Sequence, residues 1–171
     1  MKTLLLLRHA KSSWDDVDLA DLDRPLNAHG LAAAAYMGEL ISSRGFLPEM
    51  IVCSPARRAL QTGEILKESG RLDAPIRPLQ RIYEASPHTL YQVAAEFDDK
   101  LSSVMMIGHN PGFEGFIGFL TGTIEPMPTA ALAVIDLDLD RWPDLKSCAG
   151  RIVEVIRPKE AMLRNAEART K

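Results

Sequence analysis

Short apolar segments alternate along this chain with longer segments whose apolar residues recur at helical spacing. Six of the short segments have the length and composition typical of strands: Thr3–Leu7, Met50–Val52, Pro75–Leu79, Ser103–Ile107, Leu132–Leu137 and Arg151–Ile156. Four helices are predicted between them, over Gly30–Ser43, Arg57–Glu68, Pro87–Phe97 and Phe113–Leu120. This alternation indicates a three-layer α/β/α fold, in which helices cover both faces of a mostly parallel sheet of about six strands.

The order of the segments also bears on sheet topology and on the number of domains. The last two predicted strands have no long helix between them, so we expect one antiparallel pair at that edge of the sheet. A chain of 171 residues has the size of one domain, and it contains no repeat and no linker. We therefore expect a single domain over residues 1–158, followed by a charged tail or helix over residues 159–171.

Composition and charge disfavour several classes of partner. The net charge of −3 argues against nucleic-acid binding through a broad basic face. No apolar run approaches the ~18 residues of a membrane span, and the four leucines before Arg8 are too few for a secretory signal. Cys53 and Cys148 lack the spacing of a metal site, and we interpret them as reduced thiols. These observations predict a cytoplasmic protein that binds neither nucleic acid nor membrane.

Two histidines come directly after predicted strands. His9 follows the first strand together with Arg8, and His109 follows the strand that ends near Ile107. In an open α/β sheet, ligands bind at the carboxyl ends of parallel strands. We therefore expect the two imidazoles to meet at one edge of the sheet.

A pair of arginines follows another predicted strand. Ser54 is predicted to cap the next helix, whose first turn carries Arg57 and Arg58. Neighbouring side chains on a helix point in different directions, so one arginine of the pair is expected to face the site. Two imidazoles and two guanidiniums suit a tetrahedral dianion such as phosphate. Because guanidiniums repel cations, we expect no metal and no other cofactor.

Four motifs carry a resemblance to a known family. They are Arg8-His9-Ala10-Lys11, Asp23-Arg24-Pro25-Leu26-Asn27-Ala28-His29-Gly30, Ser54-Pro55-Ala56-Arg57-Arg58-Ala59-Leu60-Gln61-Thr62 and Gly108-His109-Asn110. With them the chain resembles the histidine phosphatase, or phosphoglycerate mutase-like, superfamily over roughly residues 3 to 137. The small size and the first motif look most like the SixA-type phosphohistidine phosphatase branch.

The resemblance implies a phosphoglycerate mutase-like fold and a role for each matching residue. His9 resembles the nucleophile that becomes phosphorylated, and Arg8, Arg58 and His109 resemble the rest of the phosphate pocket. Ser12 and the backbone N–H of Asn110 are candidates for further phosphate donors.

The arginine pair and Ala10 need separate comment. Arg58 directly precedes Ala59 and so matches the family arginine, which leaves Arg57 facing solvent. Ala10 stands where the family commonly has glycine, and we expect it to keep a negative φ.

Glu84 is the candidate general acid, since it comes just after a predicted strand. The alternative is an exposed loop carboxylate without a catalytic role. An alkoxide leaving group needs a proton, whereas the imidazole of phosphohistidine is a far better leaving group. Glu84 is therefore dispensable for one substrate class and required for the other.

The resemblance implies a metal-independent phosphatase that works through a phosphohistidine intermediate. The expected substrate is phosphohistidine in a signalling protein, for example a histidine phosphotransfer domain. A small-molecule phosphomonoesterase and a non-catalytic phosphate-binding module are the alternatives. The short segment between Arg58 and Glu84 leaves little length for a lid, which disfavours a mutase. The sequence leaves the oligomeric state open.

Overall fold

The computed structural model describes residues 1–147 and 149–169, so Cys148 lies outside the described residues. Six strands form one sheet in the order β3-β2-β4-β1-β5-β6. Their bounds are Lys2–Arg8 (β1), Met50–Cys53 (β2), Ile76–Pro78 (β3), Ser103–Gly108 (β4), Leu132–Leu137 (β5) and Gly150–Ile156 (β6). The helices are Ala28–Ser43 (α1), Arg57–Gly70 (α2), Pro87–Ala95 (α3), Gly112–Thr121 (α4) and Pro158–Arg169 (α5). These bounds confirm the predicted α/β fold and its alternation of strands and helices.

The sheet is mostly parallel, with one strand running against the rest. Strands β1, β2, β3 and β4 are mutually parallel. Strand β5 is antiparallel to both of its neighbours, β1 and β6. The predicted antiparallel pair is thus present as β5 and β6, and the contact between β5 and β1 adds a second one.

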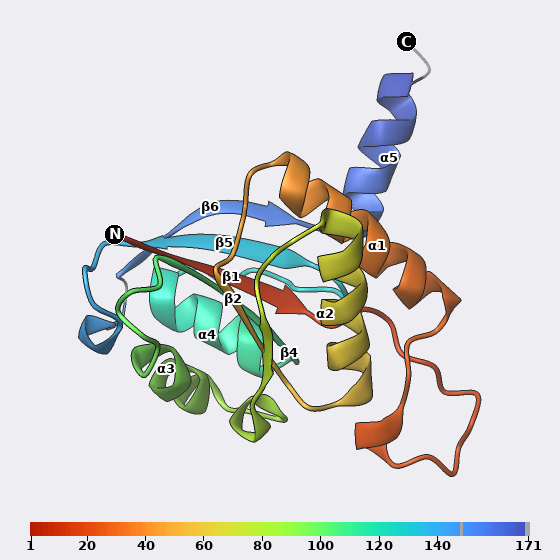
Figure 1. Cartoon of the computed structure of the whole chain (residues 1–171), viewed down its shortest axis with the longest axis horizontal. Helices are drawn as coiled ribbons and strands as arrows, with labels where there is room; N and C mark the ends of the chain where they lie inside the picture. Colours follow the sequence, from red (N-terminus) through yellow and green to blue (C-terminus); the bar gives the residue numbers. More distant parts are fainter. Residues whose placement is uncertain (148, 170–171) are drawn as a thin grey trace.

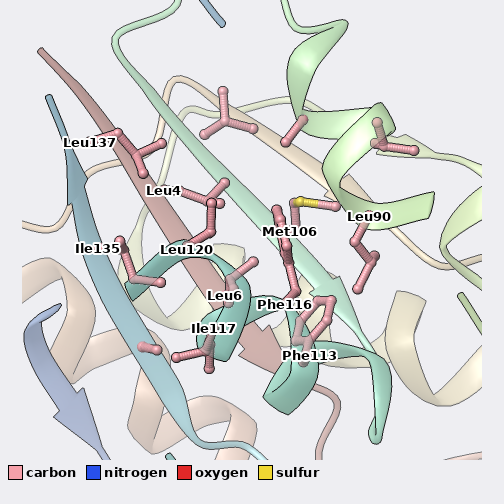
Figure 2. Close-up of a cluster of buried hydrophobic side chains, with 14 of the residues drawn as sticks. Leu4, Leu6, Leu90, Met106, Phe113, Phe116, Ile117, Leu120, Ile135 and Leu137 are labelled. Carbon is pink, nitrogen blue, oxygen red and sulfur yellow. The ribbon is translucent and has the colours of Figure 1, made fainter. Parts of the chain in front are cut away.

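Helices cover both faces of the sheet, with α1 and α2 on one face and α3 and α4 on the other (Figure 1). The run of leucines in β1 serves both layers, because alternate side chains of a strand point to opposite faces. Leu4 and Leu6 join the cluster that includes Phe113 and Phe116 of α4, shown in Figure 2. Leu5 and Leu7 join the cluster under α1 and α2. Strand β1 is therefore buried on both faces, which holds the residues that follow it in a defined position.

Two glycines allow α1 and α2 to pack closely. A Cβ on Gly38 would lie 2.4 Å from the carbonyl oxygen of Leu66, and a Cβ on Gly70 would lie 2.5 Å from the carbonyl oxygen of Gly38. Helix α2 extends to Gly70, two residues beyond the predicted end, and Arg71 with a φ of 51° ends it. The close contact therefore fixes the carboxyl-terminal half of α2 against α1.

The predicted tail forms a helix, α5, which projects away from the rest of the molecule in Figure 1. The division into a domain of residues 1–158 and a tail of residues 159–171 stays a prediction, and residues 170–171 lie outside the described chain. Cys53 is buried. Among the described helices, none combines the length and apolar character that crossing a membrane requires.

Candidate active site

The two strand-end histidines lie side by side, as the sequence predicts. Strands β1 and β4 are adjacent and parallel, and their register pairs Arg8 with Gly108. The next residue in each strand is therefore a histidine, and the N–H of His9 donates to the carbonyl of Gly108 at 3.0 Å. The ring centroids of His9 and His109 are 5.0 Å apart. Both histidines are buried, at 8% and 7% exposure.

One nitrogen of the His9 ring is held by the backbone, which leaves the other free to react. Nδ1 lies 2.7 Å from the carbonyl oxygen of Ala10, and since a carbonyl only accepts, Nδ1 carries the ring proton. The lone pair of the neutral ring is then on Nε2. Thr62 supports this turn, because its Oγ1 accepts from the N–H of Ala10 at 3.0 Å. The φ of Ala10 is not positive, as the sequence analysis predicts, so an alanine side chain fits at this position.

Arg58 connects the two imidazoles. Its Nε donates to His9 Nε2 at 3.4 Å, and its Nη2 lies 3.4 Å from His109 Nδ1. The side chain is buried at the start of α2, whereas Arg57 is exposed. The structure therefore confirms that Arg58 is the arginine of the pair that faces the site.

Ser54 holds the second imidazole instead of capping α2. The N-cap of α2 is Ala56, and no side chain caps that helix end, so the predicted cap is wrong. The Oγ atom of Ser54 lies 2.7 Å from His109 Nε2 and accepts from the N–H of Ala56 at 3.2 Å. Because Arg58 can only donate to His109 Nδ1, the neutral ring carries its proton on Nε2 and donates it to Ser54. Nδ1 of His109 therefore faces Arg58 and the site.

Arg8 is the last residue of β1 and directly precedes His9. Its Nη1 donates to the carbonyl oxygen of Met127 at 3.0 Å. Its Nε is buried and has no hydrogen-bond partner among the described residues. A buried donor without a partner costs about 1–3 kcal/mol, and an oxyanion in the site would remove that cost.

Burial and the nearby guanidiniums keep both imidazoles neutral. Burial is the largest cause that lowers the pKa of His9 to about 4, and the charges of Arg58 and Arg8 lower it further. Burial likewise lowers the pKa of His109 to about 3, with His9 and Arg58 contributing. His9 is therefore neutral at ordinary pH, with a lone pair on Nε2, and the arginines supply the positive charge.

Two residues that the sequence analysis missed complete the surroundings of Arg58. Asp21 accepts from Arg58 Nη2 at 3.0 Å through Oδ2 and from Nη1 at 2.7 Å through its carbonyl oxygen. The hydroxyl of Tyr83 donates to the same Oδ2 at 2.7 Å, and its ring meets that of His109 edge-on at 5.6 Å. The hydrogen bond from Tyr83 is the largest cause that lowers the pKa of Asp21, so its carboxylate stays ionised. Asp21 thus orients the guanidinium and does not supply protons.

The other predicted residues lie farther from these contacts. Ser12 is half-buried and forms a backbone bridge with Leu26. The side-chain Nδ2 of Asn110 donates to Glu114 Oε1 and to the carbonyl of Met127, both at 2.9 Å. Glu84 is exposed with a φ of 49°. Phosphate binding by Ser12 and by the N–H of Asn110, and acid catalysis by Glu84, stay predictions.

Within residues 1–147 and 149–169, no group of three or more histidine, cysteine, aspartate or glutamate side chains is arranged to hold a metal ion. The donors that converge are guanidiniums and imidazoles, which suit an oxyanion.

A sheet with paired histidines at its carboxyl edge and an arginine between them defines the class of protein. The model of the histidine phosphatase superfamily (branch 1) matches residues 4–100. The chain belongs to this superfamily. It is therefore a histidine-nucleophile phosphatase with the phosphoglycerate mutase-like fold.

Relatives from plants and bacteria match most of the chain. An uncharacterized chloroplastic protein of Arabidopsis thaliana is 30% identical over 158 residues, covering 87% of this chain and 72% of the relative. An uncharacterized Mycobacterium tuberculosis protein is also 30% identical over 158 residues, covering 85% of this chain and 96% of that one.

A solved structure assigned to the phosphohistidine phosphatase SixA of Agrobacterium tumefaciens is 28% identical. Its TM-score is 0.80, with 92% of this chain and 98% of that chain covered.

Proposed function

We propose that this phosphatase hydrolyses phosphohistidine on a protein and that His9 is its nucleophile. The observation that carries the proposal is a neutral His9 whose Nε2 lone pair faces the guanidinium of Arg58. The similarity to the SixA structure of A. tumefaciens supports the choice of substrate.

The first step transfers the phosphoryl group to the enzyme. His9 Nε2 attacks phosphorus and forms a P–N bond. The bond from phosphorus to the substrate's imidazole breaks, and its electron pair stays on that ring, whose other nitrogen carries a proton, so that the ring leaves as neutral imidazole. The guanidiniums of Arg8 and Arg58 hold the phosphoryl oxygens as charge redistributes. The negative charge of the phosphoryl group raises the pKa of His109, so that its Nδ1 takes up a proton and donates to an oxygen.

The second step releases phosphate. Water attacks the phosphorus of phosphorylated His9, the P–N bond breaks, and the electron pair returns to Nε2. The protons of the water leave with the phosphate or pass to solvent, and His109 returns its proton to solvent as the phosphate departs. Asp21 remains ionised throughout and keeps Arg58 aligned with both imidazoles. The cycle ends with neutral His9 and inorganic phosphate.

The groups around His9 suit a leaving group that needs little help from an acid. Among the described residues, the carboxylate in contact with Arg58 is that of Asp21, whose lowered pKa makes it a poor proton donor. An imidazole that carries a proton on its other ring nitrogen leaves phosphohistidine as a stable neutral ring. The site therefore favours phosphohistidine over an alkyl phosphate.

One observation favours a second candidate, a small-molecule phosphomonoesterase. Glu84 directly follows Tyr83, whose ring contacts His109, so Glu84 stands one residue along the chain from a group that contacts the site. Phosphoglycerate mutases also match part of the chain, with that of Clavibacter michiganensis 36% identical over 86 residues, or 34% of the mutase. In this function Glu84 protonates the departing alkoxide.

Trapping the intermediate tests the role of His9. The wild-type protein is incubated with a ³²P-labelled phosphohistidine protein and quenched in alkaline denaturant. We expect acid-labile, base-stable label on the wild type and on the exposed-residue control His88→Ala, and none on His9→Ala. A wild type that turns over no phosphorylated compound and carries no label would instead be a phosphate-binding module.

A single substitution separates the two substrate classes. Glu84→Gln keeps the size of the side chain and removes its ability to donate a proton. We expect it to leave phosphohistidine hydrolysis unchanged and to lower kcat on alkyl phosphates by about 10²-fold. An equal loss on both substrates would contradict the proposed leaving-group argument.

The proposed partner is a phosphorylated signalling protein such as a histidine phosphotransfer domain, and a cytoplasmic location is part of the proposal. Co-purification of the protein with such a partner in its phosphorylated form, and not in its unphosphorylated form, tests the choice of partner.

A further inference from the structure

A cavity of about 640 Å³ is lined by residues of α1 and of the start of α5. Its size lies in the range of ligand sites in proteins. Part of its wall is apolar, from Ala32 and Ala33 of α1 and Met162 of α5. The polar part of its wall comes from Lys11, His29, Lys159, Glu160 and Arg157.

Two segments, one after His9 and one before Ala130, contribute both to the cavity wall and to the surroundings of His9. Lys11, in the cavity wall, stands two residues after His9. Thr129, also in the wall, precedes Ala130, whose N–H donates to the carbonyl of His9 at 3.0 Å. Part of the cavity wall is thus within two residues, along the chain, of His9 or of a residue that hydrogen-bonds to it.

The charge of the cavity is set by two lysines. Lys11 and Lys159 are exposed, and neither ammonium group has a hydrogen bond or ion pair within the part of the chain that the structure describes. Arg157 is neutralised by Glu125 at 2.8 Å. Glu160 offsets one of the two lysine charges, which leaves a net positive wall.

The other rim of the site has the opposite charge. The segment between Lys11 and α1 carries five aspartates, and it lies below and to the right of α2 in Figure 1, while α5 leaves the molecule at the top. They are Asp15, Asp16, Asp18, Asp21 and Asp23. A substrate with an acidic group beside its phosphoryl group is repelled by one rim and attracted by the other.

On the basis of the proposed function, we propose that this cavity binds an acidic side chain that lies beside the phosphohistidine on the partner protein. The carboxylate pairs with Lys11 and Lys159, and the methylene groups of a glutamate lie against Ala33 and Met162. The cavity thus selects among phosphohistidine proteins by the charge next to the phosphorylated residue.

Three chemically phosphorylated histidine peptides test the proposal. They are identical except that the residues flanking phosphohistidine are Glu, Gln or Lys. Each is assayed with wild type, with the double variant Lys11→Gln/Lys159→Gln, and with Lys100→Gln, whose lysine is exposed near the opposite, amino end of β4. Free phosphohistidine is the basal substrate.

We expect kcat/KM of the wild type to be about fivefold higher for the Glu peptide than for the Gln peptide at low salt, as for exposed ion pairs. The preference persists in Lys100→Gln and weakens in 0.5 M NaCl. It disappears in the double variant, which hydrolyses free phosphohistidine at the wild-type rate.

Each other result overturns a distinct claim. Equal rates on the three peptides, or a Glu preference that survives in the double variant, refute the acidic subsite while leaving phosphohistidine hydrolysis intact. Hydrolysis of 4-nitrophenyl phosphate with no hydrolysis of any peptide or of free phosphohistidine refutes the proposed function, and the acidic subsite with it.

Discussion

Because the folded protein keeps two buried imidazoles uncharged, we expect its stability to fall as the pH drops below neutrality. The pKa of His9 is about 4 and that of His109 about 3 in the folded protein, against about 6.5 in an unfolded chain. Below pH 6.5 the unfolded chain therefore binds protons that the folded protein rejects. The free energy of unfolding decreases as the pH falls from 6.5 toward 4, and above pH 6.5 this effect is absent.

The size of the effect follows from these pKa values. At pH 5 an unfolded histidine is about 97% protonated, whereas the lowered values leave His9 about 10% and His109 about 1% protonated. Each ring then contributes a difference of about 0.9 proton, or about 1.2 kcal/mol of unfolding free energy per pH unit. The variant His109→Gln loses one of the two contributions, so its stability changes less steeply with pH by that amount.

Urea unfolding measured between pH 4.5 and 7 tests this, with the fluorescence of buried Trp142 as the signal. His88→Gln is the matched control, because that histidine is exposed. Its curve is expected to parallel that of the wild type. If His109→Gln also parallels the wild type near pH 5, the ring of His109 is charged in the folded protein and the assignment of neutral imidazoles is wrong.

Three further substitutions test the contacts around the site and beneath it. Arg58→Lys loses the planar fork that reaches both imidazoles, and we expect steady-state kcat/KM to fall about 10²-fold or more; a loss under tenfold would contradict a phosphate-holding role. Asp21→Asn removes a negative charge that opposes an anion beside Arg58, so calorimetry is expected to show about threefold tighter tungstate binding at low salt, and weaker binding would contradict this. Gly38→Val forces α1 away from the carbonyl of Leu66 and is expected to lower the unfolding free energy in urea by about 3 kcal/mol, the upper end of the usual cost of overpacking; a cost under about 1 kcal/mol would show that the two helices separate easily.

Much of the site was predictable because its residues sit at strand ends. A strand that is buried on both faces reads as an apolar run, and Arg8 and His9 stand where that run stops. His109 stands in the same relation to β4. Local pattern was enough to predict that both rings lie at the carboxyl edge of the sheet. Their direct contact follows from the adjacency of β1 and β4 in the structure.

Side chains that reach the site from irregular segments were not predictable in this way. Asp21 lies in a short turn with no periodic pattern, and its contact with Arg58 spans 37 residues of sequence. Ser54 carried a plausible local role as a helix cap, but the helix begins at Arg57 and the hydroxyl serves His109. For both residues the local sequence offers several hydrogen-bond partners, and only the packing of distant segments selects one.

The amino-acid sequence by itself determined the order of strands and helices, the burial of β1 and the strand-end positions of the two histidines, since each depends on the periodicity of nearby residues. The choice of Arg58 over Arg57 came from the match of its motif to a known family. The tertiary structure decided the reversed direction of β5 beside β1, the ionised Asp21 on Arg58 and the cavity between α1 and α5. These features depend on contacts between residues far apart in the chain. Their free energies are set by burial and by charges brought within a few ångströms, which no local pattern records.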